Sequence, residues 1–276
     1  MTLAEAAGRR YGPVPVSVAA PSVASFVAAT GDDPERWADH APPSLAAAVL
    51  FAVAPSFLSD TDVVASTRSL IHTEQSFTWH RPLAVGEIIE VEGRVVDVRA
   101  RRSLNLVKFE VTAGSWLDGT ATFLMSAEAA ATAEEEAEPV QDARAGDERP
   151  SPVPLPAPGD PIPPMARSAS RADLVRYAGA SGDWNPLHWD HQAAVAAGLP
   201  GIVVHGLLMA SWLTQAAARH APGPWPLADM RLRFRRPLRP ADQAIITGSA
   251  TEDASLKLAI AAGGVTLVSA TARVTG

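Results

Sequence analysis

A short loop in the second half of the chain places a carboxylate and an imidazole five residues apart. The segment reads Ser181-Gly182-Asp183-Trp184-Asn185-Pro186-Leu187-His188. Its Gly-Asp and Asn-Pro pairs favour turns, so its side chains are expected to project from a loop. A carboxylate beside an imidazole is a natural acid–base pair, because one group can take a proton while the other gives one. Asp183 and His188 are therefore candidates for proton transfer, with Asn185 placed to orient a water or to hold the aspartate.

The apolar segment 206–218 follows in the same half, directly after His205. Its small and apolar residues predict a long buried helix that begins at Gly206. A helix N-terminus presents unpaired N–H groups and the positive end of the helix dipole. Directed at a substrate carbonyl, these groups stabilise the enolate-like oxygen that forms when the adjacent carbon becomes negative. Gly206 is thus a candidate oxyanion site, whereas His205 is expected to support the loop and Ser211 to bond a backbone carbonyl.

His188, Asp190 and His191 are potential metal ligands that lie close together in the sequence. Their spacing is a weak signal, and His191 is expected to begin a helix and to point elsewhere. We therefore predict no metal and no cofactor.

The composition narrows the functional classes. The chain has 276 residues, a net charge of −7 and no cysteine. Disulfides, thiolate metal sites and a cysteine nucleophile are thereby excluded. An acidic chain without a dominant basic face is a poor nucleic-acid binder. We expect a cytoplasmic protein with no nucleic-acid partner.

The uncharged run from Ala41 to Ser59 approaches the length of a membrane span. Three prolines interrupt it and much of it is alanine. The run is therefore predicted to be a helix buried in a soluble core, and no membrane association is expected.

The chain contains a hidden repeat. An acidic, Pro- and Ala-rich stretch at 128–164 is typical of a linker and separates residues 1–127 from residues 165–276. Phe26–Asp32 aligns with Tyr177–Asp183, and an apolar run follows each. His80-Arg81-Pro82-Leu83 then aligns with Arg235-Arg236-Pro237-Leu238. Three landmarks in one order indicate duplication.

Each half shows the same succession of elements. A short helix ends near the Gly-Asp turn, and a long apolar helix follows, over 44–57 in the first half. Strands come next, which predicts an α+β fold with an antiparallel sheet around the long helix. The expected strands are 87–98, 104–113, 120–126, 230–234, 243–251, 256–262 and 265–274.

The segment from Tyr177 to Asp190, with Gly198-Leu199-Pro200-Gly201 and His205-Gly206, resembles the signature of MaoC-like (R)-specific enoyl hydratases and dehydratases. The resemblance implies a tandem, or double, hotdog fold. It also implies that Asp183 and His188 are the catalytic pair, that Asn185 and Ser211 support them, and that Gly206 lies at the thioester carbonyl.

The first half resembles the non-catalytic hotdog of this family more loosely. Gly31-Asp32 is present, but the sequence that follows has neither Asn-Pro nor a histidine at the place of His188. The whole chain is similar to fused two-subunit (3R)-hydroxyacyl carrier-protein dehydratases. An intramolecular pseudo-dimer with its helices side by side is expected, with a homodimer of chains as a further level.

The resemblance implies a hydro-lyase of fatty-acid or polyketide metabolism that hydrates trans-2-enoyl thioesters or dehydrates (3R)-hydroxyacyl thioesters of CoA or a carrier protein. Arg233, Arg235 and Arg236 are candidates for contacts with CoA or carrier phosphates, or else a solvated strand face. Two alternatives are a non-catalytic acyl-thioester binding module and an acyl-CoA thioesterase. The thioesterase is disfavoured because residues 207–218 contain no carboxylate.

Overall fold

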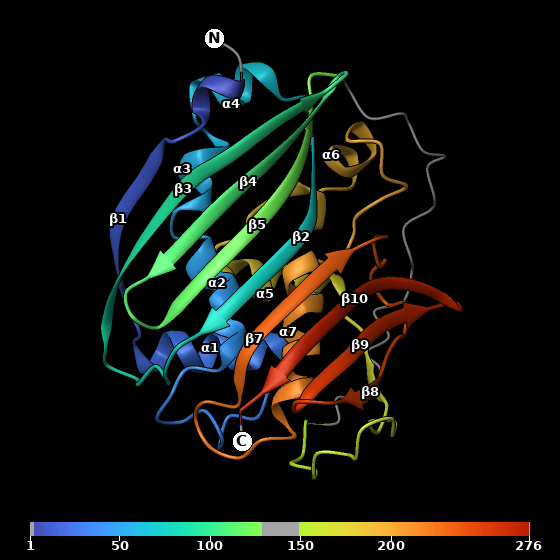
Figure 1. The fold of residues 1–276 in the computed structure, drawn as a ribbon. Coiled ribbons are helices and arrows are strands. Elements are labelled where there is room, and N and C mark those ends of the chain that lie inside the picture. Colours follow the sequence, from blue (N-terminus) through green and yellow to red (C-terminus); the bar gives the residue numbers. More distant parts are fainter. Residues whose placement is uncertain (1–2, 129–148, 276) are drawn as a thin grey trace.

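One antiparallel sheet of ten strands runs through the molecule (Figure 1). The computed structural model describes residues 3–128 and 149–275. Strand order is β1-β3-β4-β5-β2-β7-β10-β9-β8-β6, so the two halves each contribute five consecutive strands. The strands are β1 (Arg10–Ser17), β2 (Ser69–Trp79), β3 (Ile88–Arg101), β4 (Leu104–Ala113), β5 (Leu117–Ser126), β6 (Met165–Arg167), β7 (Leu227–Phe234), β8 (Ala244–Thr251), β9 (Ser255–Ala262) and β10 (Val265–Val274).

All seven expected strands are present, with ends shifted by a few residues. Three strands escaped the sequence pattern. Strand β6 is very short, and β1 contains Pro13 and Pro15, which restrict a strand to the edge of a sheet. Strand β2 has few aliphatic residues, and Ser69–Trp79 alternates polar and apolar positions only over its second half. Its sequence therefore lacks a clear strand pattern.

The repeat detected in the sequence becomes a pseudo-two-fold axis between β2 and β7. The offset that relates His80 to Arg235 also relates Ser76 to Arg231, and these two residues face each other across the antiparallel pair. The axis therefore passes through this pair. Equivalent strands lie at equal distances from it on either side, which gives one continuous sheet instead of two.

The helices gather on one face of this sheet (Figure 1). Helices α1 (Ala20–Thr30) and α5 (Arg171–Ser181) are the equivalent short helices, and each ends at a glycine with positive φ, Gly31 or Gly182. These glycines are the Gly-Asp turns of the repeat. Helix α7 (Gly206–Ala218) is the long helix of the second half, and every residue after its first is buried. A helix that is apolar on all sides belongs in the core, as expected.

The single long helix expected over 44–57 is not formed. The structure has instead 3₁₀ turn η2 (Pro43–Leu45) and short helices α2 (Ala46–Leu50) and α3 (Ala54–Leu58), followed by α4 (Thr61–Ser66). Pro55 explains the break, because proline lacks the N–H that would continue a helix from α2 and its ring crowds the preceding turn. Proline fits only the first turn of a new helix, which is where it lies.

The predicted linker is described only in part, since residues 129–148 lie outside the described residues. Its last portion runs along the sheet edge formed by β8. The N–H of Ile162 donates to Gly248, and the N–H of Gly159 to Ala250. Short elements η1 (Leu3–Ala6), η3 (Pro186–His188) and α6 (His191–Ala196) complete the described chain. Within it, the helices are too short or too polar to cross a bilayer.

Candidate active site

The turn after α5 places Asp183 in the interior. A reciprocal cap between Ser170 and Asp173 fixes the start of α5, and Gly182 ends the helix with φ 80°. The side chain of Asp183 is buried, and its Oδ1 accepts the backbone N–H of Asn185 at 3.3 Å. Burial raises the pKa of Asp183 to about 6, although that hydrogen bond acts in the opposite direction. The carboxyl group thus titrates close to neutrality, as a proton-transfer group should.

His188 lies on the short turn η3, and the side chain of Asn185 caps this turn by accepting the N–H of Leu187. The Nδ1 of His188 contacts the carbonyl oxygen of Val203 at 2.8 Å. Burial lowers the pKa of His188 to about 4, so the ring is neutral near pH 7. A neutral ring that donates from Nδ1 leaves Nε2 as a hydrogen-bond acceptor.

His205 connects the two candidate groups. Its ring is fully buried and stacks on that of His188, with ring centroids 3.7 Å apart. Its Nε2 lies 3.2 Å from the backbone carbonyl of Asp183. Burial, with a smaller contribution from His188, lowers the pKa of His205 to about 2, which keeps this ring neutral. His205 therefore supports the loop, as its sequence position predicts, through its contacts with His188 and with the backbone of Asp183.

The potential metal ligands that the structure brings together differ from the three considered in the sequence. Asp183, His188 and His205 each offer a ligand atom, and these atoms lie within 4.8 Å of one another. The stacking of the two rings argues against an ion between them. An ion at Zn–N distance from both would lie well out of each ring plane, away from the nitrogen lone pairs. His191 begins α6, as predicted.

The carboxylate of Asp183 and the imidazole of His188 line a cavity of about 670 Å³ to which both halves of the chain contribute. Both halves contribute apolar side chains to its walls, although the sequence pattern did not indicate which residues of the first half take part. Residues on α2, α3 and the following turn face loop and helix residues of the second half. The first half contributes Leu50, Phe51, Ala54, Pro55, Leu58, Ser59, Leu70, Ile71, His72 and Phe123.

His72 is a polar residue of this wall that the sequence analysis did not single out. Its ring lies between those of Phe123 and Phe234, with centroids 4.9 Å and 5.0 Å away. Burial lowers its pKa to about 4. Its location on β2 gives it no motif of its own, and only the β2–β7 junction brings it beside the loop of the other half.

Gly206 opens α7 at the cavity wall. Among the described residues, the N–H groups of Gly206 and Leu207 have no hydrogen-bond acceptor. Both residues line the cavity, so these donors are available to a bound carbonyl. Ser211 lies deeper in α7, where its hydroxyl donates to the carbonyl of Leu207 at 2.9 Å, and it does not line the cavity.

The three arginines singled out in the sequence do not all lie at the same site. Arg235 and Arg236 line the cavity, together with the exposed ring of Trp184. Arg233 points to the outer face of the sheet, where it forms an ion pair with Glu74 at 2.6 Å. Side chains alternate along this part of β7, since Leu232 is buried and Arg231 and Arg233 are exposed.

The equivalent turn in the first half ends differently. Asp32 is buried like Asp183, and burial raises its pKa, but the charged groups that act on it are Arg36 and Arg167. Gln215 joins the halves here, since it accepts from Arg167 at 3.1 Å and donates to the carbonyl of Thr30 at 3.0 Å. The turn of the first half thus stabilises the junction.

Family models match both halves of the chain. Residues 155–272 match the MaoC like domain, and residues 5–123 match the FAS1-like dehydratase domain region. A curated relative, 3-hydroxyacyl-thioester dehydratase X of Mycobacterium tuberculosis, is 29% identical over 195 residues. That match covers 69% of this chain and 63% of the relative, which is less than two thirds of the relative's length.

Solved structures show the same architecture over nearly the whole chain. A MaoC-like dehydratase superposes with a TM-score of 0.80 at 20% identity and covers 98% of both chains. A conserved hypothetical protein of Mycobacterium tuberculosis, described as a double hotdog fold, gives a TM-score of 0.63 at 14% identity, with 98% of this chain and 96% of the other covered. The expected double hotdog fold is confirmed.

Proposed function

We propose that the protein adds water to 2-enoyl thioesters and removes it from 3-hydroxyacyl thioesters, because its second half matches the MaoC like domain and its first half matches the FAS1-like dehydratase domain region. The observation that supports this most directly is the buried pair Asp183 and His188 in the wall of a largely apolar cavity. A carbonyl-binding helix N-terminus lines the same cavity. The proposed substrates are trans-2-enoyl and (3R)-hydroxyacyl thioesters.

The chemistry assigned to each group follows from its protonation. In hydration, ionised Asp183 and the free Nε2 of neutral His188 accept the two hydrogens of one water. The water oxygen bonds to C3, the C2–C3 π electrons move toward the thioester carbonyl, and the N–H groups of Gly206 and Leu207 stabilise the resulting oxyanion. Asp183 takes the proton released by the water.

The same carboxyl group then returns a proton to C2, so that one H and one OH have been added and Asp183 is ionised again. We assign the transfer to Asp183 because its pKa of about 6 is closer to neutrality than that of His188. His188 holds the water and stays neutral. Dehydration uses the same steps in reverse order.

The test is hydration of crotonyl-CoA, followed by loss of the enoyl absorbance. We expect Asp183→Asn and His188→Ala to lower kcat by about 10²–10⁴-fold, the range of general acid–base catalysis. Unchanged rates in both variants, with both proteins folded by circular dichroism, would remove the assignment. Release of free thiol from crotonyl-CoA would instead indicate a thioesterase, and binding without turnover a binding module.

Two further proposals concern the state of the protein. We propose a cytoplasmic location, which the acidic and cysteine-free composition supports. We also propose that two chains associate, although each chain already contains its own hotdog pair. Light scattering after size-exclusion chromatography tests the second proposal, and a single-chain mass at micromolar concentration would contradict it.

A further inference from the structure

A second hollow, of about 700 Å³, lies on the outer face of the sheet, opposite α7. Figure 1 shows this face, with the strands in front of the helices. Residues of β4, β5, β2, β7, β10 and β9 line the hollow, so it crosses the junction between the two halves. We call it the outer groove. The catalytic cavity lies on the other side of the sheet.

Strand register explains which side chains the groove presents. Two adjacent rows of outward-facing residues each cross five neighbouring strands, and together they cover the six. Both rows contain short hydroxyl side chains and longer basic side chains. One row is Lys108, Thr122, Glu74, Arg233 and Ser269, and the other is Thr120, Ser76, Arg231, Thr271 and Lys257.

The groove is basic although the chain as a whole is acidic. Glu74 is the one carboxylate among the lining residues, and it is already paired with Arg233. The exposed Glu110 on β4 lies at the end of the second row, opposite Thr120, and outside the lining of the groove. Among the described residues, the other lining cations have no carboxylate partner, and Arg235 donates only to the hydroxyl of Ser269 at 3.3 Å. A concentration of unpaired cations on a protein of net charge −7 attracts anionic partners. These cations are Lys108, Arg231, Arg235 and Lys257.

Arg235 joins the outer groove to the catalytic cavity, because it lines both. Pairing of β2 with β7 extends only as far as Glu74 and Arg233. Just beyond that pair, Ile71 and His72 of β2 line the cavity instead. The route from the outer face to the catalytic groups therefore begins where the two central strands separate.

We propose that the outer groove docks an acidic acyl-carrier protein whose thioester arm enters the catalytic cavity past Arg235. The spread of the cations favours a folded partner over a nucleotide. Lys108 and Lys257 lie on strands five spacings apart, about 24 Å, which matches an acidic helix of roughly 16 residues. A diphosphate group occupies a small fraction of that length. The proposal rests on the proposed function for its thioester substrate.

The experiment compares two substrates, crotonyl-CoA and the crotonyl thioester of a purified acidic acyl-carrier protein. Arg231→Glu and Lys257→Glu reverse exposed charges in the groove, away from the catalytic cavity. Arg101→Glu, at the exposed end of β3, is the matched control. Each groove variant should lower kcat/KM for the carrier thioester about tenfold and weaken its salt dependence, since steering charges act on association. Crotonyl-CoA should change less than about twofold with every variant.

Binding of the fluorescently labelled carrier protein, measured by anisotropy, separates this proposal from the proposed function because it needs no turnover. Binding that the two groove variants weaken and Arg101→Glu does not would support docking, even if crotonyl-CoA were not hydrated. Turnover of crotonyl-CoA together with carrier binding that is unaffected by the groove variants would overturn the groove and leave the function intact. An equal loss of kcat/KM with both substrates in the groove variants would also overturn the docking proposal.

Discussion

Burial acts in opposite directions on the two groups that we assign to proton transfer. It raises the pKa of the Asp183 carboxyl to about 6 and lowers that of the His188 imidazole to about 4. Each shift follows from the same desolvation of the charged form. Above about pH 6, the site therefore holds an ionised Asp183 carboxylate beside a neutral His188 ring.

The pH dependence of hydration follows from this pairing. Asp183 works as a base only when ionised, and the ionised form is lost as the pH falls through about 6. We expect kcat/KM for crotonyl-CoA to fall by about tenfold per pH unit below that value and to stay level above it to about pH 8. A rate that declined as the pH rose through 6 would show that protonated Asp183 is the active form.

His205 offers a way to separate its two contacts. His205→Gln keeps a side-chain N–H that can reach the carbonyl of Asp183 but removes the ring stacked on His188. His205→Phe keeps a ring and leaves that buried carbonyl unpaired, which costs about 1–3 kcal/mol. If the hydrogen bond positions Asp183, His205→Phe should lower kcat by about tenfold more than His205→Gln, with little change in KM. Equal losses in kcat would argue against that role.

We expect the site at Asp183, His188 and His205 to work without a metal ion, and removal of metal ions by a chelator tests this. The rings of His188 and His205 stack with an interplanar angle of 25°, which disfavours an ion bound in the planes of both rings. Dialysis against EDTA should therefore leave the hydration rate within about twofold of its starting value, whereas loss of a catalytic metal costs orders of magnitude. A large loss that Zn²⁺ restores would reassign all three residues as ligands.

At the level of single residues, the sequence identified groups whose spacing is local. Asp183, Asn185 and His188 belong to one turn, so a short motif fixes their relation. His72 was not found, because it reaches the cavity only through pairing of strands far apart in the sequence. No residue pattern within β2 distinguishes a histidine that faces a cavity from one that faces solvent.

Among the elements, the broken helix of the first half matters most for the cavity. Continuous α7 fills the core of its own half, whereas α2 and α3 separate near Phe51 and leave space between the halves. Apolar composition alone predicted one helix over 44–57. Pro55 was visible in the sequence, but proline can either kink a helix or begin a new one, and tertiary packing decides between these outcomes.

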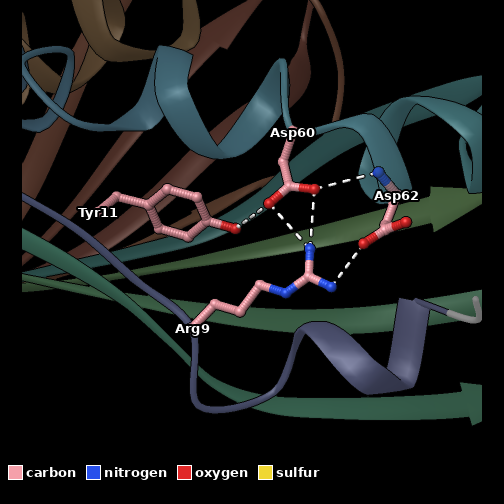
Figure 2. Close-up of polar contacts among 4 residues, drawn as sticks. All are labelled: Arg9, Tyr11, Asp60 and Asp62. Carbon is pink, nitrogen blue, oxygen red and sulfur yellow. Dashed lines mark hydrogen bonds and ion pairs between the residues drawn. The ribbon is translucent and has the colours of Figure 1, made fainter.

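A polar cluster holds α3 and α4 against β1 (Figure 2). Arg9 donates to both oxygens of Asp60, at 2.8 Å and 2.9 Å, and also to Asp62, while the hydroxyl of Tyr11 donates to Asp60 at 3.0 Å. Asp60 also caps α4 through the N–H of Asp62. Since α3 forms part of the cavity wall, this cluster fixes that wall from behind.

Adjacent arginines on β1 and its preceding turn allow a matched test of the cluster. Arg9→Gln breaks two hydrogen bonds to Asp60 in the α3–α4 turn and one to Asp62 in α4, whereas Arg10→Gln breaks an exposed pair with Glu92. Arg9→Gln should lower Tm more than Arg10→Gln, because isolated exposed ion pairs contribute little. It should also raise the ratio of kcat/KM for octenoyl-CoA to that for crotonyl-CoA as the wall loosens. An unchanged ratio would show that the cluster stabilises the fold without shaping the cavity.

In the whole molecule, the two halves are joined by more than the connecting segment. Strands β2 and β7 pair at the centre of the sheet, and the rings of Phe26 and Tyr177 meet between α1 and α5, with centroids 6.1 Å apart. Further hydrogen bonds cross the junction, from Gln215 to Thr30, from Arg36 to Ala221 and from Trp225 to Trp79. Neither half encloses the catalytic cavity alone.

Cutting the chain between the halves tests whether these contacts suffice. A specific protease site placed within residues 129–148 would divide the polypeptide and leave every contact named above in place. We expect the two fragments to elute together from a sizing column and to keep crotonyl-CoA hydration within about twofold. The reason is that a central strand pair with a buried helix interface resembles an obligate dimer interface, which stays associated without a covalent link. Elution as separate fragments, or loss of activity on cleavage, would show that the connection itself is needed to maintain the shared cavity.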